Sequence, residues 1–170
     1  MNIFASFPCP ERSARILDDS RIIKMPLESC QLMATTAARL NRWVAPMPRP
    51  THAHHPLVDW VGAGRLNFEW LWNHALAMDQ ERRDRFGNPS RHKTMAACDK
   101  AKIWRLASRL PSGSTPFVNC ARNKNLGIDF THLEVHLAYR SYLVARWRSQ
   151  MRPAICTIAG LLDKGPNWRT

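Results

Sequence analysis

The side chains with the clearest chemical potential lie on one face of a predicted helix, between Asp19 and Leu40. At about 100° per residue, five polar side chains of this stretch fall within an arc of roughly 80°: Arg21, Lys24, Glu28, Gln31 and Thr35. Most other positions are apolar, which is typical of a helix buried around most of its circumference, so the polar row should face a cleft or a partner. A carboxylate there could move protons, and the cations could hold phosphate. The i,i+4 spacing of Lys24 and Glu28 equally fits a simple helix-stabilising ion pair.

A second candidate is the histidine-rich loop after this helix. His52, His54 and His55 lie within the segment THAHHP. Imidazole is a common zinc ligand, but no carboxylate or cysteine stands at ligand spacing in this proline-rich loop. We therefore favour hydrogen bonding to an anion, or proton transfer, over metal binding.

A third candidate is the face shared by Asn67, Trp70 and His74, which follow one another at i,i+3 and i,i+4 steps of a predicted helix. The aromatic ring beside two hydrogen-bonding groups could form a stacking platform for a nucleic-acid base. Packing in the core, with the polar groups satisfied inside the protein, explains the same pattern, and both interpretations stay open.

The charge of the chain indicates a polyanionic partner. Lys and Arg number 25 against 13 Asp and Glu, which gives a formal net charge of +12. Such an excess favours nucleic acid first and an anionic membrane surface second. Phosphate contacts of this kind add affinity without sequence information, and a solvated surface accounts for many of the basic residues.

The composition predicts one globular domain over residues 1–170, because 45% of the residues are hydrophobic and seven are Trp. Five cysteines without a CxxC motif predict reduced thiols in a cytoplasmic compartment. No window approaches ~20 apolar residues, so no membrane span is expected. The chain has no Walker A, GxGxxG or HxE…PCxxC motif, and we predict neither a cofactor nor a metal.

The elements that must position these residues are mainly helices. The pattern predicts an extended segment over Asn2–Phe7, a proline-rich loop over Trp43–Pro56, a long loop over Pro111–Asp129 and an irregular tail with one helical turn at most. Four long helices are expected: Asp19–Leu40 with a kink or a second start at Pro26, Leu57–Arg85, Lys93–Leu110 and His132–Met151. The fold class is therefore mainly α, a single compact helical domain with a short N-terminal extended segment.

The order of several motifs resembles a family of small bacteriophage proteins. DSRIIKMPLESCQLM, THAHHP followed by Trp60, NFEWLWNH, RFG followed by His92, and AYRSY are similar to the family's DKHVVKM…LE…Q, THxxHP…W, NxxWLxxH, RYG…H and AYRxYY. The resemblance implies a phage protein acting in an infected bacterium and leaves the reaction open. The positions that match the pattern are Asp19, Lys24, Glu28, Gln31, His52, His55, Trp60, Asn67, Trp70, His74, Arg85, Gly87, His92, Tyr139 and Arg140.

The chain departs from this family pattern in several places. Arg21 stands where the pattern has His, Ser20 where it has Lys, and His54 where it usually has Asn. An acidic segment of the pattern is replaced here by Asn119–Asn123. These changes bear on which substrate the chain would accept.

Together these features predict a polar cleft walled by the Lys24/Glu28/Gln31 row, the His52–His55 loop, the Asn67/His74 face and Arg140. Catalytic candidates are Asp19 or Glu28 as the acid–base group and His55 as a second proton carrier. Substrate-binding candidates are Arg21, Lys24, Gln31, His52, Asn67, Trp70, His74, Arg85, Tyr139 and Arg140. In this prediction Arg21, Lys24 and Arg140 clamp phosphate, and Trp70 or Tyr139 stacks a base.

The first functional hypothesis is a metal-independent enzyme that acts on DNA or a nucleotide by base modification or glycosyl-bond chemistry. The hypothesis includes glycosyl-bond chemistry because carboxylates can catalyse it without a metal or cofactor. The alternatives are a non-catalytic basic DNA-binding, host-takeover or anti-defence protein, and a pocket for a small signalling nucleotide. In each case the expected partner is nucleic acid or nucleotide, with no membrane.

Overall fold

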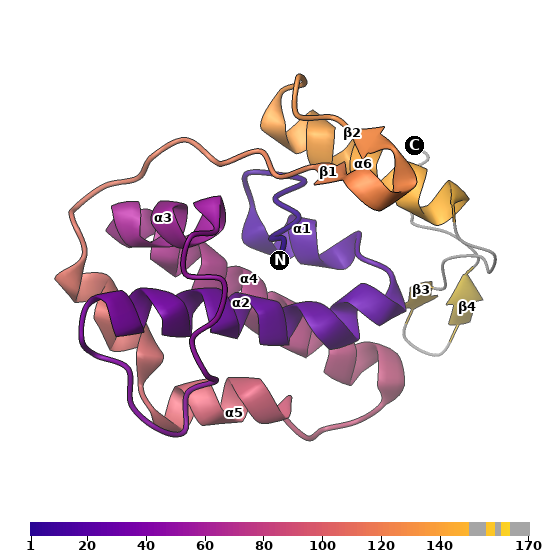
Figure 1. Cartoon of the computed structure of the whole chain (residues 1–170). Coiled ribbons are helices and arrows are strands. Elements are labelled where there is room, and N and C mark those ends of the chain that lie inside the picture. Colours follow the sequence, from indigo (N-terminus) through magenta and orange to yellow (C-terminus); the bar gives the residue numbers. More distant parts are fainter. Residues whose placement is uncertain (150–155, 159–160, 164–170) are drawn as a thin grey trace.

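The computed structural model describes residues 1–149, 156–158 and 161–163, and this part of the chain is mainly helical. Two long helices, α2 (Asp19–Arg39) and α4 (Arg65–Phe86), pack along each other at its centre. Around them lie α1 (Pro10–Arg15), α3 (Pro56–Ala63), α5 (Lys93–Lys100) and the 3-10 helix η1 (Ile103–Arg109). The helix α6 (Val135–Arg148) lies at the edge opposite α5 (Figure 1). The predicted mainly α fold is confirmed.

Helix α2 begins where the sequence predicts, because Asp18 caps it. The Asp18 side chain accepts a hydrogen bond from the Arg21 backbone N–H at 3.1 Å, which satisfies one of the free donors of the first turn. The helix buries less of its circumference than expected: Ile23 is 50% exposed and Leu27 is 37% exposed. Its polar row therefore has solvent on one side and packed protein on the other.

The N-terminal segment runs in an extended, irregular path between α2 and α6. Ile3 and Ala5 are buried, and the Phe4 ring packs against Tyr139 and Tyr142, with ring centroids 6.2 and 5.9 Å apart. The expected short extended segment is thus present, and it is part of the hydrophobic core. This packing fixes the first residues of the chain between α2 and α6 (Figure 1).

The single helix predicted over residues 57–85 is wrong, because the chain breaks between α3 and α4. Gly64 is extended there, and a Cβ atom at this position would lie 2.7 Å from the Gly113 carbonyl oxygen. The approaching loop caps α4, with the Arg65 N–H donating to the Pro111 carbonyl at 2.8 Å. The break depends on a loop about fifty residues further along the chain, so local periodicity did not reveal it.

Two further predicted helices are shorter than expected. The stretch Lys93–Leu110 is divided into α5 and η1, because Lys102 adopts a left-handed backbone conformation with φ of 52°. The stretch His132–Met151 contains α6, which starts later because the Glu134 side chain caps it by accepting from the N–H groups of its first turn. The C-terminal limit of that prediction, at residues 150 and 151, lies outside the described residues.

The predicted long loop contains a small hairpin. Strand β1 (Arg122–Asn123) pairs antiparallel with β2 (Ile128–Asp129), and the 3-10 turn η2 (Lys124–Leu126) connects them. Further on, β3 (Cys156–Ile158) pairs with β4 (Leu161–Asp163), where the sequence predicted an irregular tail with at most a helical turn. Residues 150–155, 159–160 and 164–170 lie outside the description. No helix in the described ranges is both long and apolar enough to cross a bilayer.

Candidate active site

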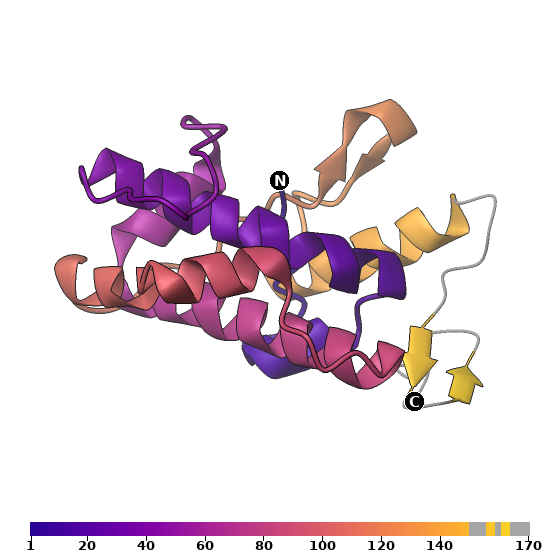
Figure 2. The same cartoon turned by 90° about the horizontal axis from the view of Figure 1, so that it is seen from below.

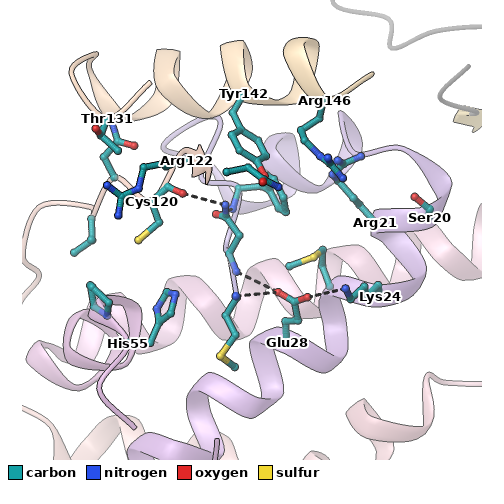
Figure 3. Close-up of a pocket in the computed structure, with 18 residues that line it drawn as sticks. Ser20, Arg21, Lys24, Glu28, His55, Cys120, Arg122, Thr131, Tyr142 and Arg146 are labelled. Atoms are coloured by element: carbon teal, nitrogen blue, oxygen red, sulfur yellow. Dashed lines mark hydrogen bonds and ion pairs between the residues drawn. The ribbon is translucent and has the colours of Figure 1, made fainter. Parts of the chain in front are cut away.

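A cavity of about 930 Å³ opens between the first half of α2, the N-terminal segment and α6. The start of α3 and the chain around β1 complete its walls (Figure 3). Four of the residues predicted as site residues line it: Arg21, Lys24, Glu28 and His55. Its walls thus combine a carboxylate, an imidazole and several cations, which is a set suited to binding an anionic substrate and moving protons.

Glu28 lies at the floor of this cavity between three nitrogen atoms. Its Oε2 accepts a hydrogen bond from the Asn2 backbone N–H at 3.1 Å and lies 4.0 Å from the amino group of Met1. Its Oε1 lies 3.4 Å from the Lys24 Nζ. The Glu28 side chain is only 16% exposed, whereas that of Lys24 is 72% exposed. The carboxylate is therefore held in place on the amine side and is open to solvent on the lysine side (Figure 3).

The residues around the Met1 amine are anchored by the protein itself. The Asn2 side-chain oxygen accepts from the backbone N–H groups of Ile3 and Phe4 at 2.8 and 3.2 Å, and its amide donates to the Cys120 carbonyl at 3.4 Å. The Met1 side chain is 3% exposed. These contacts, together with the buried Ile3, hold the amine against Glu28 without help from a ligand.

Arg21 is a positioned cation at the cavity wall. Its guanidinium pairs with the Asp18 carboxylate and lies over the Phe4 ring, 5.5 Å from the ring centroid. Asp18 also accepts a hydrogen bond from the Trp147 indole N–H at 2.7 Å. Burial alone would raise the pKa of Asp18, but the Arg21 charge and the hydrogen bonds from Trp147 and Ser20 outweigh it and lower the pKa. Asp18 therefore stays ionised and keeps Arg21 in place.

His55 joins the cavity from the α3 side, across from Tyr142 and Arg146 (Figure 3). Its Nδ1 accepts from the Leu57 backbone N–H at 3.2 Å, which caps α3 and leaves the proton on Nε2. Burial lowers the pKa of His55, with smaller contributions from the N-terminal amine and His52. The imidazole is therefore neutral at pH 7 and available as a hydrogen-bond donor or a proton carrier.

The cavity also contains residues that the sequence did not predict as site residues. Met1 and Asn2 carry no side-chain signal of a site, while Arg122 and Arg146 could be recognised only as basic residues among many. Tyr142, Asn119, Cys120, Asn123 and Thr131 complete this wall. All but Met1 and Asn2 come from the second half of the chain. The sequence placed the α2 side of the site, and it marked Asn119–Asn123 only as a departure from the family pattern and not as part of the opposite wall.

Two predicted site residues pair with each other away from the cavity. The Arg85 guanidinium lies 3.2 Å from the Asp19 carboxylate and 3.1 Å from the Glu81 carboxylate, and it donates to the Leu17 and Arg15 carbonyls at 2.7 and 2.9 Å. Asp19 and Arg85 do not line the cavity. The expectation that they act on substrate there is corrected: they tie the start of α2 to the end of α4.

The predicted Asn67/His74 wall is likewise absent from the cavity. The Asn67 amide donates to the Trp60 carbonyl at 2.7 Å, and the Trp70 indole donates to the Pro8 carbonyl at 2.6 Å. His74 is buried, bonds the Pro10 carbonyl through Nδ1 at 2.9 Å and stacks on Trp70. Asn67 and Trp70 find their partners within the protein, and His74 does so through Nδ1, which matches the core-packing interpretation of this face.

The remaining four predicted residues are also outside the cavity. Tyr139 is fully buried and bonds the Val118 carbonyl at 3.1 Å, and Arg140 donates to the Ser6 carbonyl at 2.7 Å. His52 is exposed and bonds Thr51, and Gln31 is half-buried.

Gln31 and His52 are outside the cavity because the histidine loop packs on the second half of α2. The Thr35 side chain accepts from the Thr51 N–H at 2.9 Å, so the histidine loop covers the end of the polar row. Among the described residues no group of three His, Cys, Asp or Glu side chains is placed to hold a metal ion.

Comparison with known proteins identifies the family. No curated protein and no solved structure matched the chain. The profile of the family described as pyrimidine dimer DNA glycosylase matches residues 1–95, which include Arg21, Lys24, Glu28 and His55. This match covers more than half of the 170 residues and contains the carboxylate and the amine at the floor of the cavity. The chain therefore belongs to the pyrimidine dimer DNA glycosylase family.

Proposed function

We propose that this protein cleaves the glycosyl bond of a dimerised pyrimidine in DNA, with Glu28 and the amine beside it as the reacting groups. The observation that carries the proposal is the pair formed by the Glu28 carboxylate and the Met1 amine, 4.0 Å apart at the floor of a basic cavity. Family membership supports a DNA glycosylase activity.

The amine and the Glu28 carboxylate are sufficient to account for each bond that forms or breaks and for the proton that moves. The neutral amine attacks C1′ of the damaged nucleotide, a C–N bond forms, and the bond from C1′ to the pyrimidine nitrogen breaks with its electron pair leaving on the base. The proton released by the amine passes to Glu28, and the carboxylate also stabilises positive charge that develops at C1′. Opening of the sugar ring then converts the adduct into an imine.

The Met1 amine fits this role better than the amine of Lys24. The Met1 side chain is 3% exposed and the amine is held among the Asn2 and Glu28 contacts, so it needs little reorganisation to react. Lys24 is 72% exposed and its ammonium is solvated. Should Met1 be removed, the Asn2 nitrogen, 3.1 Å from Glu28, would take its place as the free amine.

The cations around the cavity fit the DNA backbone. Arg21, Lys24, Arg122 and Arg146 line the cavity, and the chain carries a net charge of +12. Such side chains neutralise phosphates and hold the duplex over the opening. A nucleotide turned out of the stack could then enter the cavity, with the neutral His55 imidazole available to donate a hydrogen bond to it.

The experiment uses a duplex that carries a single cyclobutane pyrimidine dimer, with the undamaged duplex as the control and EDTA present. The wild-type protein should release or cleave only the damaged strand. Glu28→Gln should lower that rate by about 10²–10⁴-fold. Glu69→Gln is the matched control, because Glu69 forms the same i,i+4 type of ion pair with Arg65 on α4, outside the cavity.

Two results would contradict the proposal. One is a wild-type protein that binds both duplexes and converts neither of them, which would favour the non-catalytic DNA-binding alternative. The other is a Glu28→Gln variant as active as Glu69→Gln.

A further inference from the structure

A second hollow, which we call the η1 groove, lies between the segment 41–50 and the chain that runs from the end of α5 through η1. Its volume is about 270 Å³, and it shares no lining residue with the active-site cavity. Segment 41–50 follows α2, and η1 follows α5 at the edge opposite α6 (Figure 1). Figure 2 views the molecule from that edge and has η1 toward one end and α6 toward the other. The groove is therefore separate from the candidate active site.

The rim of the η1 groove is strongly basic. Four exposed cations line it, and no carboxylate lines it in the described part of the chain: Arg42, Lys102, Arg105 and Arg109. Among the described residues, none of these four forms an ion pair. The Arg105 guanidinium lies 5.3 Å from the centroid of the Trp104 ring, which restricts its positions. Four like charges in one place repel each other, so an anionic partner would stabilise them.

The floor of the η1 groove is apolar and already formed. Met47 and Leu106 are 6% and 7% exposed there, and Val44 beside them is 50% exposed. Two internal hydrogen bonds close the segment: the Met47 N–H donates to the Val44 carbonyl at 3.0 Å, and the Trp43 indole donates to the Pro48 carbonyl at 2.9 Å. A partner would thus meet an ordered apolar surface, and little conformational entropy would be lost on binding.

This combination of charge and apolar surface favours a peptide over DNA. A duplex presents phosphates at its surface and keeps its bases stacked inside, so it would use the cations and leave the apolar floor without a partner. A volume of about 270 Å³ is small for a pocket that holds a whole ligand and suits one or two side chains. Aspartate and glutamate pair with arginine, and an apolar side chain between them would cover Met47 and Leu106.

We propose that the η1 groove binds a short acidic peptide of a partner protein, with one large apolar side chain seated on Met47 and Leu106. The carboxylates of the peptide pair with the rim cations. The apolar side chain supplies most of the affinity, whereas the charges set the orientation and the association rate. Because the groove and the active-site cavity have separate walls, the peptide and a DNA duplex should bind at the same time. This inference does not depend on the proposed function.

The first test measures the binding of a fluorescein-labelled peptide that has three aspartates on each side of a leucine. Fluorescence anisotropy is recorded at about 0.15 M salt, where distant charges are screened. Arg105→Glu should weaken binding by about tenfold. Lys24→Glu is the matched control, because it makes the same change of charge at an exposed cation of the active-site cavity, and it should have little effect. A loss that is equal in the two variants, or larger for Lys24→Glu, would overturn the proposal.

The second test concerns the apolar floor. Replacing the leucine of the peptide by asparagine should weaken binding to the wild-type protein by about tenfold. Val44→Asn should weaken binding of the leucine peptide and affect the asparagine peptide much less. Ile23→Asn is the matched control, because Ile23 is also β-branched and 50% exposed but lies on α2, outside the groove. Equal binding of the two peptides to the wild type would contradict the proposed seat for an apolar side chain.

The third test locates the peptide on the wild-type protein. The leucine is replaced by a photoreactive diazirine analogue, and the crosslinked residues are identified by mass spectrometry with and without an undamaged duplex. Crosslinks should fall on residues 42–47 and 101–109 and persist when the duplex is added. Crosslinks to α6, or their loss when the duplex is added, would refute the proposal. A duplex affinity that falls as much with Arg105→Glu as with Lys24→Glu would assign the groove to nucleic acid instead.

Discussion

Helices α2 and α4 both carry polar side chains on largely apolar surfaces, yet the two sets have different surroundings. On α2, Lys24 and Glu28 line a cavity, and the lysine is mostly exposed. On α4, Asn67, His74 and Arg85 are buried and bonded to backbone carbonyls of other segments. A polar row on an apolar helix is therefore a candidate site where part of it stays open to solvent, as at Lys24.

The carbonyls that α4 satisfies belong largely to the chain before α2, at both ends of the short helix α1 and on either side of it. Trp70 bonds Pro8, His74 bonds Pro10, and Arg85 bonds Arg15 and Leu17. Backbone groups outside regular structure need such partners when they are buried. Helix α4 thus fixes the segment that leads from the N-terminus to α2, and indirectly supports the position of the amine beside Glu28.

The largest expected effect concerns the amine. Residues added before Met1 convert its amine into an amide, which is not a nucleophile, so base release should fall to the background rate while stability is retained. The same protein, after a protease has removed the added residues to expose Met1, should recover its activity. Full activity in the extended chain would show that a different group reacts.

On the α4 side the expected effect is on stability. Arg85→Met leaves the Asp19 and Glu81 carboxylates without their buried partner, and unfolding free energy should fall by about 3–5 kcal/mol. Denaturant titration measures this change. Arg65→Met on the same helix is the control, since Arg65 is 55% exposed and its ion pair should contribute at most about 1 kcal/mol. A similar loss of stability in the two variants would contradict the claim that the buried ion pairs of Arg85 contribute more than the exposed ion pair of Arg65.

A third prediction concerns acid. Burial lowers the pKa of His74 to about 4 from its ordinary value of 6.5, so the folded protein binds fewer protons than the unfolded chain between these values. The stability of the protein should therefore be complete above pH 6.5 and decrease by about 3 kcal/mol as the pH falls to 4.

The measurement for this prediction is the melting temperature as a function of pH, for wild type and His74→Gln. The melting temperature of the variant should depend much less on pH. The dependence that is left should come from His55 and His92, because burial also lowers their pKa values. An unchanged slope would mean that His74 is not the group that resists protonation.

The smallest expected effect belongs to the exposed end of the α2 row. Lys24→Met should weaken DNA binding and reduce the slope of log affinity against log salt by about one, with little change in the melting temperature. Lys100→Met, an exposed lysine on α5 outside the cavity, should leave the slope unchanged. Identical slopes for the two variants would show that Lys24 does not contact the DNA.

Much of the fold was predictable where the determinants are local. The cap at Asp18 and the glycine at Gly87 mark real helix ends, and α2 was predicted to within one residue. The break at Gly64 was not predictable in this way, because it results from the approach of Gly113. The two-residue strands β1 and β2 are too short to show alternation.

The site was predictable only in part for a related reason. Helical spacing correctly grouped Arg21, Lys24 and Glu28, and His55 joined them. The same reasoning could not distinguish a face that meets solvent from one that meets another segment, so Asn67 and its neighbours on α4 were included as well. The Met1 amine has no sequence pattern at all and became visible only through its distance to Glu28. The phage context stays a prediction from the motif order.

The most direct test of the mechanism is to trap the reaction intermediate with borohydride. The protein is incubated with the dimer-containing duplex and borohydride, digested with trypsin, and the peptide that carries the nucleotide is identified by mass spectrometry. The account predicts a reduced adduct on the N-terminal amine, formed by the wild type and lost in Glu28→Gln. Product formation without any trapped adduct, or an adduct on Lys24, would contradict it.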